Sequence, residues 1–306
     1  MFASQIPFSR GRAGLVPEMK GFRMQIVVAS ALGWCFGVRD AVAAANSVTN
    51  PAEVTIFGEL VHNEQVLQQL QDRGLHQLTE GDRQRLPSTP TVLITAHGIS
   101  ERNWQRLTNA GLAIVDTTCP LVRRVHAAAR LLVQEDRHLV VIGQPGHVEV
   151  LGIVEDFPAT DVWPDVASVT TTEHRRLGVI SQSTTRPDVA EAVLGRIREL
   201  HPHAEIRWVD TICQPTRDRQ RAIEELLDQI SVLVVVGGQR SNNSQALAER
   251  ARTRGIRAHL VQTADQLQQD WFRCDDVVGL TAGTSTPDAA ITAVQQRLEA
   301  IRQQWN

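Results

Sequence analysis

The sequence predicts an α/β fold in which largely parallel sheets are covered by helices and the chain is divided into three similar units. Short β-branched runs alternate along the 306 residues with amphipathic stretches, a pattern typical of parallel strands joined by crossover helices. A cysteine-containing pattern also recurs three times at intervals that suit small α/β units. Together these observations favour repeated units over one elaborate domain.

The strands are expected where short apolar runs occur, namely at residues 24–29, 53–58, 91–96, 112–117, 138–143, 177–182, 205–210, 232–238 and 277–283. Their nearly continuous apolar character indicates burial on both faces of a sheet. Segments between them, such as 121–135 and 217–230, have the apolar spacing of amphipathic helices. The last helix is expected to begin with Thr286 as its cap and Pro287 in its first turn.

The repeated pattern consists of CFGVRDAVAAA from Cys35, CPLVRRVHAAA from Cys119 and CQPTRDRQRAI from Cys213. Each segment fits C-x-x-[VT]-R, and the cysteines are 84 and 94 residues apart. Each cysteine follows a predicted strand and opens a predicted helix. The carboxyl edge of an open α/β sheet is where ligands bind, so we expect three functional thiols there.

The repeat predicts three α/β units, at residues 24–118, 119–209 and 210–306. Cys274 lies outside the pattern, and we expect it to be a buried thiol of no further role. Residues 1–23 lack the apolar core of a signal peptide. We expect them to be a disordered extension, or upstream sequence if translation begins at Met24.

The composition excludes several classes of partner. With 31 basic and 34 acidic residues the net charge is -3, and no clustered basic excess indicates a nucleic-acid partner. No apolar run reaches the roughly 20 residues that a membrane span needs. The expected location is therefore the cytoplasm, where disulfides between the four cysteines are not expected.

Three thiols can meet if the three units pack around a common axis. A helix amino end lowers the pKa of a thiol and favours the thiolate that binds metal. Three thiolates with an open fourth position suit either a catalytic zinc ion or an iron-sulfur cluster with one iron free to bind substrate. A structural zinc ion would need a fourth protein ligand, and none fits the repeat.

The other strand exits carry polar residues suited to binding a phosphate or diphosphate: His62, His97, His147, Ser183, Ser241, Asn242, Asn243 and Ser285. Imidazoles, neutral donors and helix amino ends bind such anions. Each residue could instead be a helix cap or turn residue. The sequence has no phosphate-binding loop and no convincing dinucleotide motif, so a nucleotide is not the obvious anion.

Glu149, two residues after His147, could deliver a proton if burial raises its pKa. A proton donor, a soft metal centre and an anion site together predict reduction or elimination on a small phosphorylated substrate.

Nine motifs occur in a recognisable order: GWCFGV, VHNEQV, TAHGIS, DTTCPLV, GHVEVLG, SQSTT, DTICQPTRDRQ, SNNSQALAE and TAGTSTPD. From Met24 onward, they resemble the family of 4-hydroxy-3-methylbut-2-enyl diphosphate reductases, the last enzymes of the methylerythritol phosphate route to isoprenoids. The resemblance implies a trefoil-like arrangement of three α/β units around one [4Fe-4S] cluster per chain, held by Cys35, Cys119 and Cys213. It also implies reductive dehydroxylation of an allylic diphosphate to isopentenyl and dimethylallyl diphosphate, with electrons from a separate ferredoxin- or flavodoxin-type donor.

The resemblance also implies a role for each polar position. His62, His97 and His147 would line the diphosphate pocket, Ser241, Asn242, Asn243 and Ser285 would donate to its oxygens, and Glu149 would deliver protons. Departures from the family pattern are Ser183 for a usual threonine, Asn242 for a usual serine, and Gln144 and Val148 for a histidine and a proline. The alternatives are a cluster-binding redox sensor, against which the retained Glu149 argues, and a paralogue acting on another allylic diphosphate.

Overall fold

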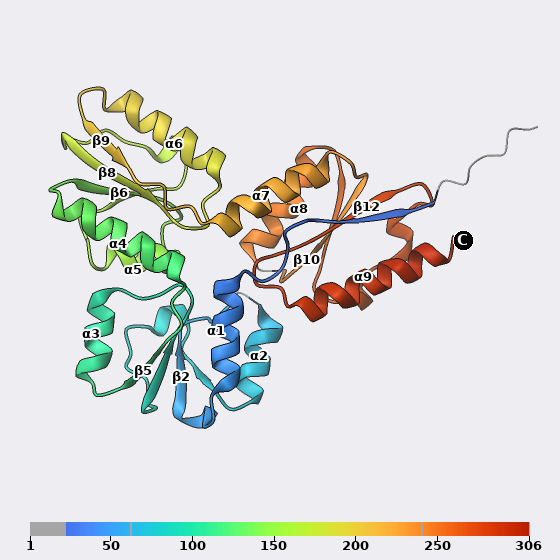
Figure 1. The fold of residues 1–306 in the computed structure, drawn as a ribbon, viewed down its shortest axis with the longest axis horizontal. Coiled ribbons are helices and arrows are strands. Elements are labelled where there is room, and N and C mark those ends of the chain that lie inside the picture. The colour runs from blue at the N-terminus through green and yellow to red at the C-terminus, as the bar shows by residue number, and fades with distance from the viewer. Residues whose placement is uncertain (1–22, 62, 240, 306) are drawn as a thin grey trace, which may run out of the picture.

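The computed structural model has the predicted α/β fold and describes residues 23–61, 63–239 and 241–305. Its strands form three separate four-stranded parallel sheets, and Figure 1 shows them as three lobes around a common centre. Buried apolar side chains form six clusters, two for each sheet. Both faces of each sheet are therefore covered, which explains the apolar runs of the strands.

Two of the sheets are built from consecutive strands. The first contains β2 (Val54–Phe57), β3 (His76–Gln77), β4 (Thr91–Ile94) and β5 (Ala113–Asp116), in the order β3-β2-β4-β5. The second contains β6 (His138–Ile142), β7 (Asp161–Trp163), β8 (Arg176–Ser181) and β9 (Glu205–Trp208), in the order β7-β6-β8-β9. In each of these two sheets, the strand that comes second in sequence lies at one edge and the strand that comes fourth lies at the other.

The third sheet repeats this order but takes its last strand from the other end of the chain. It contains β10 (Val232–Val236), β11 (Arg257–Val261), β12 (Val277–Ala282) and β1 (Gln25–Val28), in the order β11-β10-β12-β1. In the parallel β1–β12 ladder, Gln25 lies opposite Val277. The strand that we placed in the unit 24–118 therefore belongs to the third sheet, because β12 offers the edge that β5 and β9 fill elsewhere.

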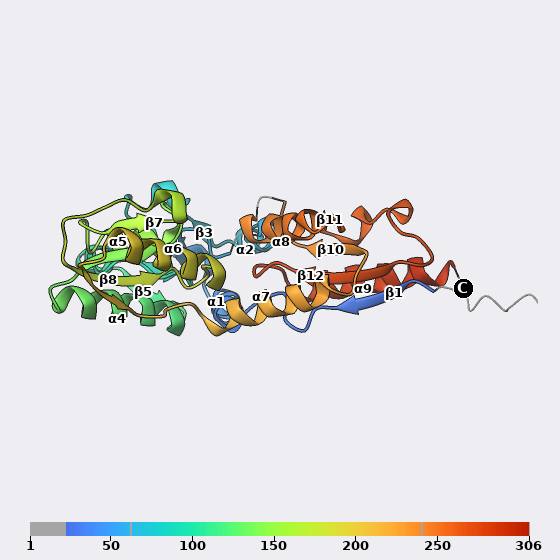
Figure 2. The ribbon, with the colours of Figure 1, turned by 90° about the horizontal axis from the view of Figure 1, so that it is seen from above.

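Helices follow the strands at equivalent places in the three sheets. After the first strands come α2 (Glu64–Asp72), α5 (Val148–Val154) and α8 (Asn242–Thr253). After the third strands come α3 (Glu101–Asn109), α6 (Pro187–Leu200) and α9 (Asp288–Gln303). After the fourth strands, α1 (Phe36–Ser47), α4 (Pro120–Gln134) and α7 (Gln214–Leu227) lead into the next sheet. Figure 2 shows α1, α4 and α7 along one side of the flat molecule and α2, α5 and α8 along the other.

Two local expectations are wrong. The cap residue of α9 is Pro287, because the hydroxyl of Thr286 donates instead to the carbonyl of Val236 at 2.9 Å. The thiol of Cys274 is exposed rather than buried, since it lies in a turn before β12. Among the described helices, none is both long and apolar enough to cross a membrane.

Candidate active site

The three repeated cysteines occupy the N-cap positions of the helices that follow the fourth strands. Cys35 precedes α1, Cys119 precedes α4 and Cys213 precedes α7, and all three thiols are free and half-buried. Each cysteine carbonyl accepts a bond from the backbone N–H four residues later, at 2.9, 3.0 and 3.3 Å respectively. Figure 1 shows the amino ends of these helices converging at the centre of the molecule. The sequence repeat is therefore also a structural repeat.

The thiols are close enough to influence one another. Burial raises the pKa of Cys119 against the effect of the N–H groups of Leu121 and Val122, and the charges of Cys35 and Cys213 raise it further. Burial likewise raises the pKa of Cys213, which a bond to Thr216 opposes and the charge of Cys35 reinforces. Burial and mutual repulsion therefore favour the neutral thiols, and a bound positively charged group would be needed to hold all three as thiolates.

The donor set of three thiols suits an iron-sulfur cluster with one iron left open. A zinc ion with Zn–S bonds of 2.3 Å holds its thiolates only about 3.8 Å apart. In the described part of the chain, no three His, Cys, Asp or Glu side chains are arranged to hold one metal ion. A four-iron cluster binds each thiolate through a different iron and so accepts a wider spacing. Cys35, Cys119 and Cys213 could hold such a cluster and leave one iron without a protein ligand.

Gly37, in the first turn of α1, allows the Cys119 thiol to approach. A Cβ atom at this glycine would lie 2.6 Å from the Cys119 Sγ and 3.0 Å from its Cβ. We therefore expect Gly37→Ala to displace the thiol and at least halve the iron and sulfide bound per folded chain. Gly195→Ala is the matched control, because a Cβ there, within α6, meets no atom within 4 Å. Equal cluster content in the two variants would contradict this expectation.

Glu149 is the buried acid of the site, with only 1% of its surface exposed. It lies in the first turn of α5, where its Oε1 accepts from the backbone N–H of Ser183 at 2.6 Å and its Oε2 accepts from the Ser183 hydroxyl at 2.7 Å. Burial raises the pKa of Glu149 to about 7, although both bonds from Ser183 act in the opposite direction. The side chain can therefore hold a transferable proton near neutral pH.

Ser183 connects this acid to a cysteine. The backbone N–H of Cys213 donates to the carbonyl of Ser183 at 2.9 Å, while the N–H and hydroxyl of Ser183 donate to Glu149. The charge of Glu149 also acts on the Cys213 thiol. The predicted proton donor, Glu149, and one predicted cluster ligand, Cys213, are therefore both hydrogen-bonded to Ser183.

Two of the three predicted histidines lie together. The ring centroids of His97 and His147 are 5.7 Å apart in an edge arrangement. His147 caps α5, and its Nδ1 accepts from the N–H of Glu149 at 3.2 Å. This bond assigns the proton of a neutral His147 to Nε2, which makes that nitrogen a donor. The third predicted histidine, His62, lies outside the described residues.

The third sheet contributes the remaining predicted residues. Ser241 is buried and caps α8, where its hydroxyl accepts from the N–H of Ser244 at 3.3 Å. Asn243 follows in the first turn, and its buried Nδ2 has no hydrogen-bond partner among the described residues. Ser285 is buried just before α9. Asn242 begins α8, but its side chain lies outside the description.

Ser244 is a further polar residue at the exit of β10, to which the sequence motifs assign no role. Its hydroxyl is fully buried and has no hydrogen-bond partner within the described chain. It occupies the space that a side chain would need at Gly237 or Gly283. These glycines follow β10 and β12 in the loops that carry Ser241 and Ser285. Ser244 and Asn243 thus present two unsatisfied donors beside the predicted anion site.

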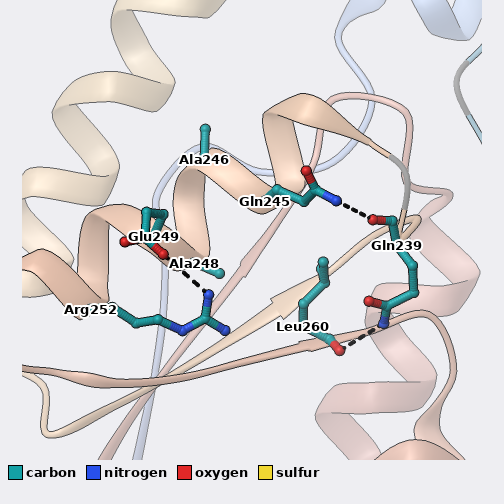
Figure 3. Close-up of a pocket in the computed structure, with 7 residues that line it drawn as sticks. All are labelled: Gln239, Gln245, Ala246, Ala248, Glu249, Arg252 and Leu260. Carbon is teal, nitrogen blue, oxygen red and sulfur yellow. Dashed lines mark hydrogen bonds and ion pairs between the residues drawn. The ribbon is translucent and has the colours of Figure 1, made fainter.

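A cavity of about 540 Å³ lies between α8 and β11 (Figure 3), and none of the predicted site residues lines it. Its polar side chains bond to one another or to backbone, as Gln245 does to the carbonyl of Gln239 and Gln239 to that of Leu260. No cysteine, histidine or buried acid lines it. The site chemistry therefore belongs to the centre of the molecule and not to this cavity.

Comparison with known proteins identifies the family of this chain. A family profile described as LytB protein matches residues 26–299. The chain belongs to the LytB protein family. A LytB relative from Acinetobacter baumannii, named 4-hydroxy-3-methylbut-2-enyl diphosphate reductase, is 34% identical over 287 residues, which is 90% of both chains. A relative of the same name from Aquifex aeolicus is 30% identical over 292 residues, 91% of this chain and 97% of the relative.

Solved structures of similar proteins extend the LytB comparison. One, described as (E)-4-hydroxy-3-methyl-but-2-enyl diphosphate reductase and the terminal enzyme of the non-mevalonate pathway, has a TM-score of 0.66 and 30% identity, covering 90% of this chain and 99% of its own. The E-1-hydroxy-2-methyl-but-2-enyl-4-diphosphate reductase from Plasmodium falciparum has a TM-score of 0.79 over 91% of this chain and 88% of its own. At 24% identity, the second match supports the fold alone.

Proposed function

We propose that this chain is a 4-hydroxy-3-methylbut-2-enyl diphosphate reductase, the last enzyme of the methylerythritol phosphate route. The reaction adds two electrons and two protons to the allylic alcohol diphosphate, breaks its carbon–oxygen bond and releases water with isopentenyl or dimethylallyl diphosphate. Membership of the LytB family supports this reaction, as do the named relatives at 30 to 34% identity. The single observation that carries the proposal is the buried Glu149 next to Cys213, one of three cysteines that cap converging helices.

The LytB family is iron-sulfur dependent, and we infer one [4Fe-4S] cluster per chain on Cys35, Cys119 and Cys213. When held by these three cysteines, the cluster would supply the electrons for the reduction. The electrons come from a separate ferredoxin- or flavodoxin-type donor. The chain itself contributes thiolates at three helix amino ends, where the helix dipoles favour the negative charge.

The proton is the contribution of Glu149. Its carboxyl group carries the transferable proton, and the two bonds from Ser183 fix the direction in which the group points. Protonation of the departing hydroxyl lets it leave as water rather than as hydroxide. The serine that replaces the usual threonine keeps the hydroxyl that bonds to Glu149.

The diphosphate is assigned to the donors that follow the first and third strands. His97 and His147 provide imidazole groups, and Asn243 and Ser244 provide buried donors with no partner in the described protein. Ser241, Asn242, Ser285 and His62 complete the proposed set on the basis of their motif positions. Neutral donors and helix amino ends can bind a diphosphate without a nucleotide-binding motif.

The pKa of Glu149 predicts the pH dependence of turnover. A proton donor is active only in its protonated form, and the pKa of about 7 means that the active fraction is high below this pH and lost above it. We therefore expect kcat/KM, which reports the substrate-free enzyme, to fall roughly tenfold for each pH unit well above about 7. The measurement is kcat/KM between about pH 6 and 9 with cluster absorbance recorded in parallel. A flat profile with an intact cluster would contradict the assignment.

The function is tested by product analysis under anaerobic conditions. Purified protein is incubated with 4-hydroxy-3-methylbut-2-enyl diphosphate and reduced methyl viologen, and the products are separated from substrate. Both isopentenyl and dimethylallyl diphosphate are expected. A protein that binds a cluster but forms neither product would instead be a sensor or a paralogue with another substrate.

A further inference from the structure

Arg219 is a cation that the site described above does not use. It lies in α7, and its Nη2 donates to the carbonyl of Gly33 at 2.6 Å, across 186 residues of sequence. Its Nη1 donates to the carbonyl of Pro215 at 3.0 Å. The loop before Cys35 is therefore tied to the helix that Cys213 caps.

The Arg219 side chain is partly buried and lies near two of the thiols. Its Nε is buried and has no hydrogen-bond partner among the described residues. Burial lowers the pKa of Arg219, while the negative charges of Cys35 and Cys213 act to raise it. An arginine remains charged in such surroundings, so a fixed positive charge lies near two of the three proposed cluster ligands.

Three other arginines that follow the cysteines are neutralised by carboxylates. The arginine four residues after each cysteine forms an ion pair: Arg39 with Asp288, Arg123 with Asp116 and Arg217 with Asp210. Within the described part of the chain, Arg219 has no carboxylate partner of this kind, and its neighbour Asp218 pairs with Arg221. The charge of Arg219 is therefore available to act on the site.

We propose that Arg219 is a positioning residue that fixes the Cys35 loop on α7 and raises the reduction potential of the cluster through its positive charge. This inference rests on the proposed function, since it requires the cluster. Reduction adds one negative charge to a centre already bearing three thiolates, and a nearby cation stabilises the reduced form more than the oxidised form. In low-dielectric surroundings this effect is stronger than in water.

The charge can be separated from the hydrogen bonds by two substitutions. Arg219→Gln keeps a donor for the Gly33 carbonyl and removes the charge, whereas Arg219→Lys keeps both a donor and the charge. Arg221→Gln is the matched control, because Arg221 lies on the same helix with 68% of its side chain exposed. The readouts are iron and sulfide per chain, and the midpoint potential of the substrate-free protein from a redox titration followed by cluster absorbance.

The expected result is a lower potential in Arg219→Gln alone. At a fixed potential its ratio of reduced to oxidised cluster should fall at least tenfold, which corresponds to a shift of about 59 mV for one electron. Arg219→Lys should show less than half of this shift, and Arg221→Gln none. If Arg219→Gln loses the cluster and Arg219→Lys keeps it, the result would show that the cluster depends on the positive charge at this position and not on the hydrogen bonds alone.

Two results would overturn the inference while leaving the proposed function intact. One is an unchanged potential in Arg219→Gln with full cluster content, which would show that the charge has no influence. The other is loss of the cluster from both Arg219 variants, which would reduce the residue to a packing role. Absence of iron and sulfide from the unaltered protein would overturn the proposed function and this inference together.

Discussion

Glu149→Gln should lower kcat by about 10²- to 10⁴-fold, the range that general acid catalysis contributes, while cluster content stays unchanged. The substitution preserves the shape of the side chain. The amide oxygen can still accept from the N–H of Ser183, and the amide nitrogen can donate to its hydroxyl, so the contacts at 2.6 and 2.7 Å remain possible. What the amide lacks is a transferable proton, so the loss should appear in turnover and not in folding.

Ser183→Ala is the control for Glu149→Gln. It removes only the hydroxyl that bonds to Oε2 of Glu149 and leaves the backbone N–H bond to Oε1. Because the proton remains on Glu149, turnover of this variant should fall much less than in Glu149→Gln. Near-normal turnover of Glu149→Gln, in a preparation with a full cluster, would remove Glu149 from the mechanism.

Cys213→Ser should abolish both the cluster and turnover, and the same result is expected at Cys35 and Cys119. A serine oxygen is a harder ligand than a thiolate and is rarely deprotonated, so the soft three-sulfur site is lost. The local fold should persist, because the N–H of Cys213 bonds through the backbone to Ser183. Iron and sulfide analysis together with circular dichroism separates loss of the cluster from loss of structure.

Cys274→Ser provides the matched control for the cysteine variants. Its thiol is exposed in a turn before β12 and lies outside the repeat of helix-capping cysteines. Full cluster content is expected in this variant. If Cys274→Ser loses the cluster while remaining folded, or if Cys213→Ser retains a full cluster, the proposed ligand set is wrong.

The architecture could be predicted where the sequence signal is local. Nine apolar runs correspond to the central strands and to the fourth strand of each sheet. The remaining strands, β3, β7 and β11, are edge strands, and β3 and β7 have only two and three residues. Short or mixed edge strands bury little apolar surface and so leave little pattern to detect. The pairing of β1 with β12, across some 250 residues, depends on the whole fold.

The candidate site likewise contains residues that the local sequence predicts and contacts that it does not predict. The cysteines could be found because each opens a helix with a recurring local sequence, and the structure keeps all three as N-caps. Contacts between distant segments could not be found. The bond from Ser183 to Glu149 joins residues 34 apart, and that from Arg219 to Gly33 joins residues 186 apart. Such partners become visible only when the sheets are assembled.

The central claim, a cluster-dependent reductase, is tested most directly by one anaerobic preparation. Iron, sulfide and zinc are measured per chain, and the same sample is assayed with 4-hydroxy-3-methylbut-2-enyl diphosphate and reduced methyl viologen. We expect about four iron and four sulfide ions per chain, little zinc, and formation of both isoprenoid diphosphates. Zinc without iron that persists after cluster reconstitution, together with no product, would contradict the claim.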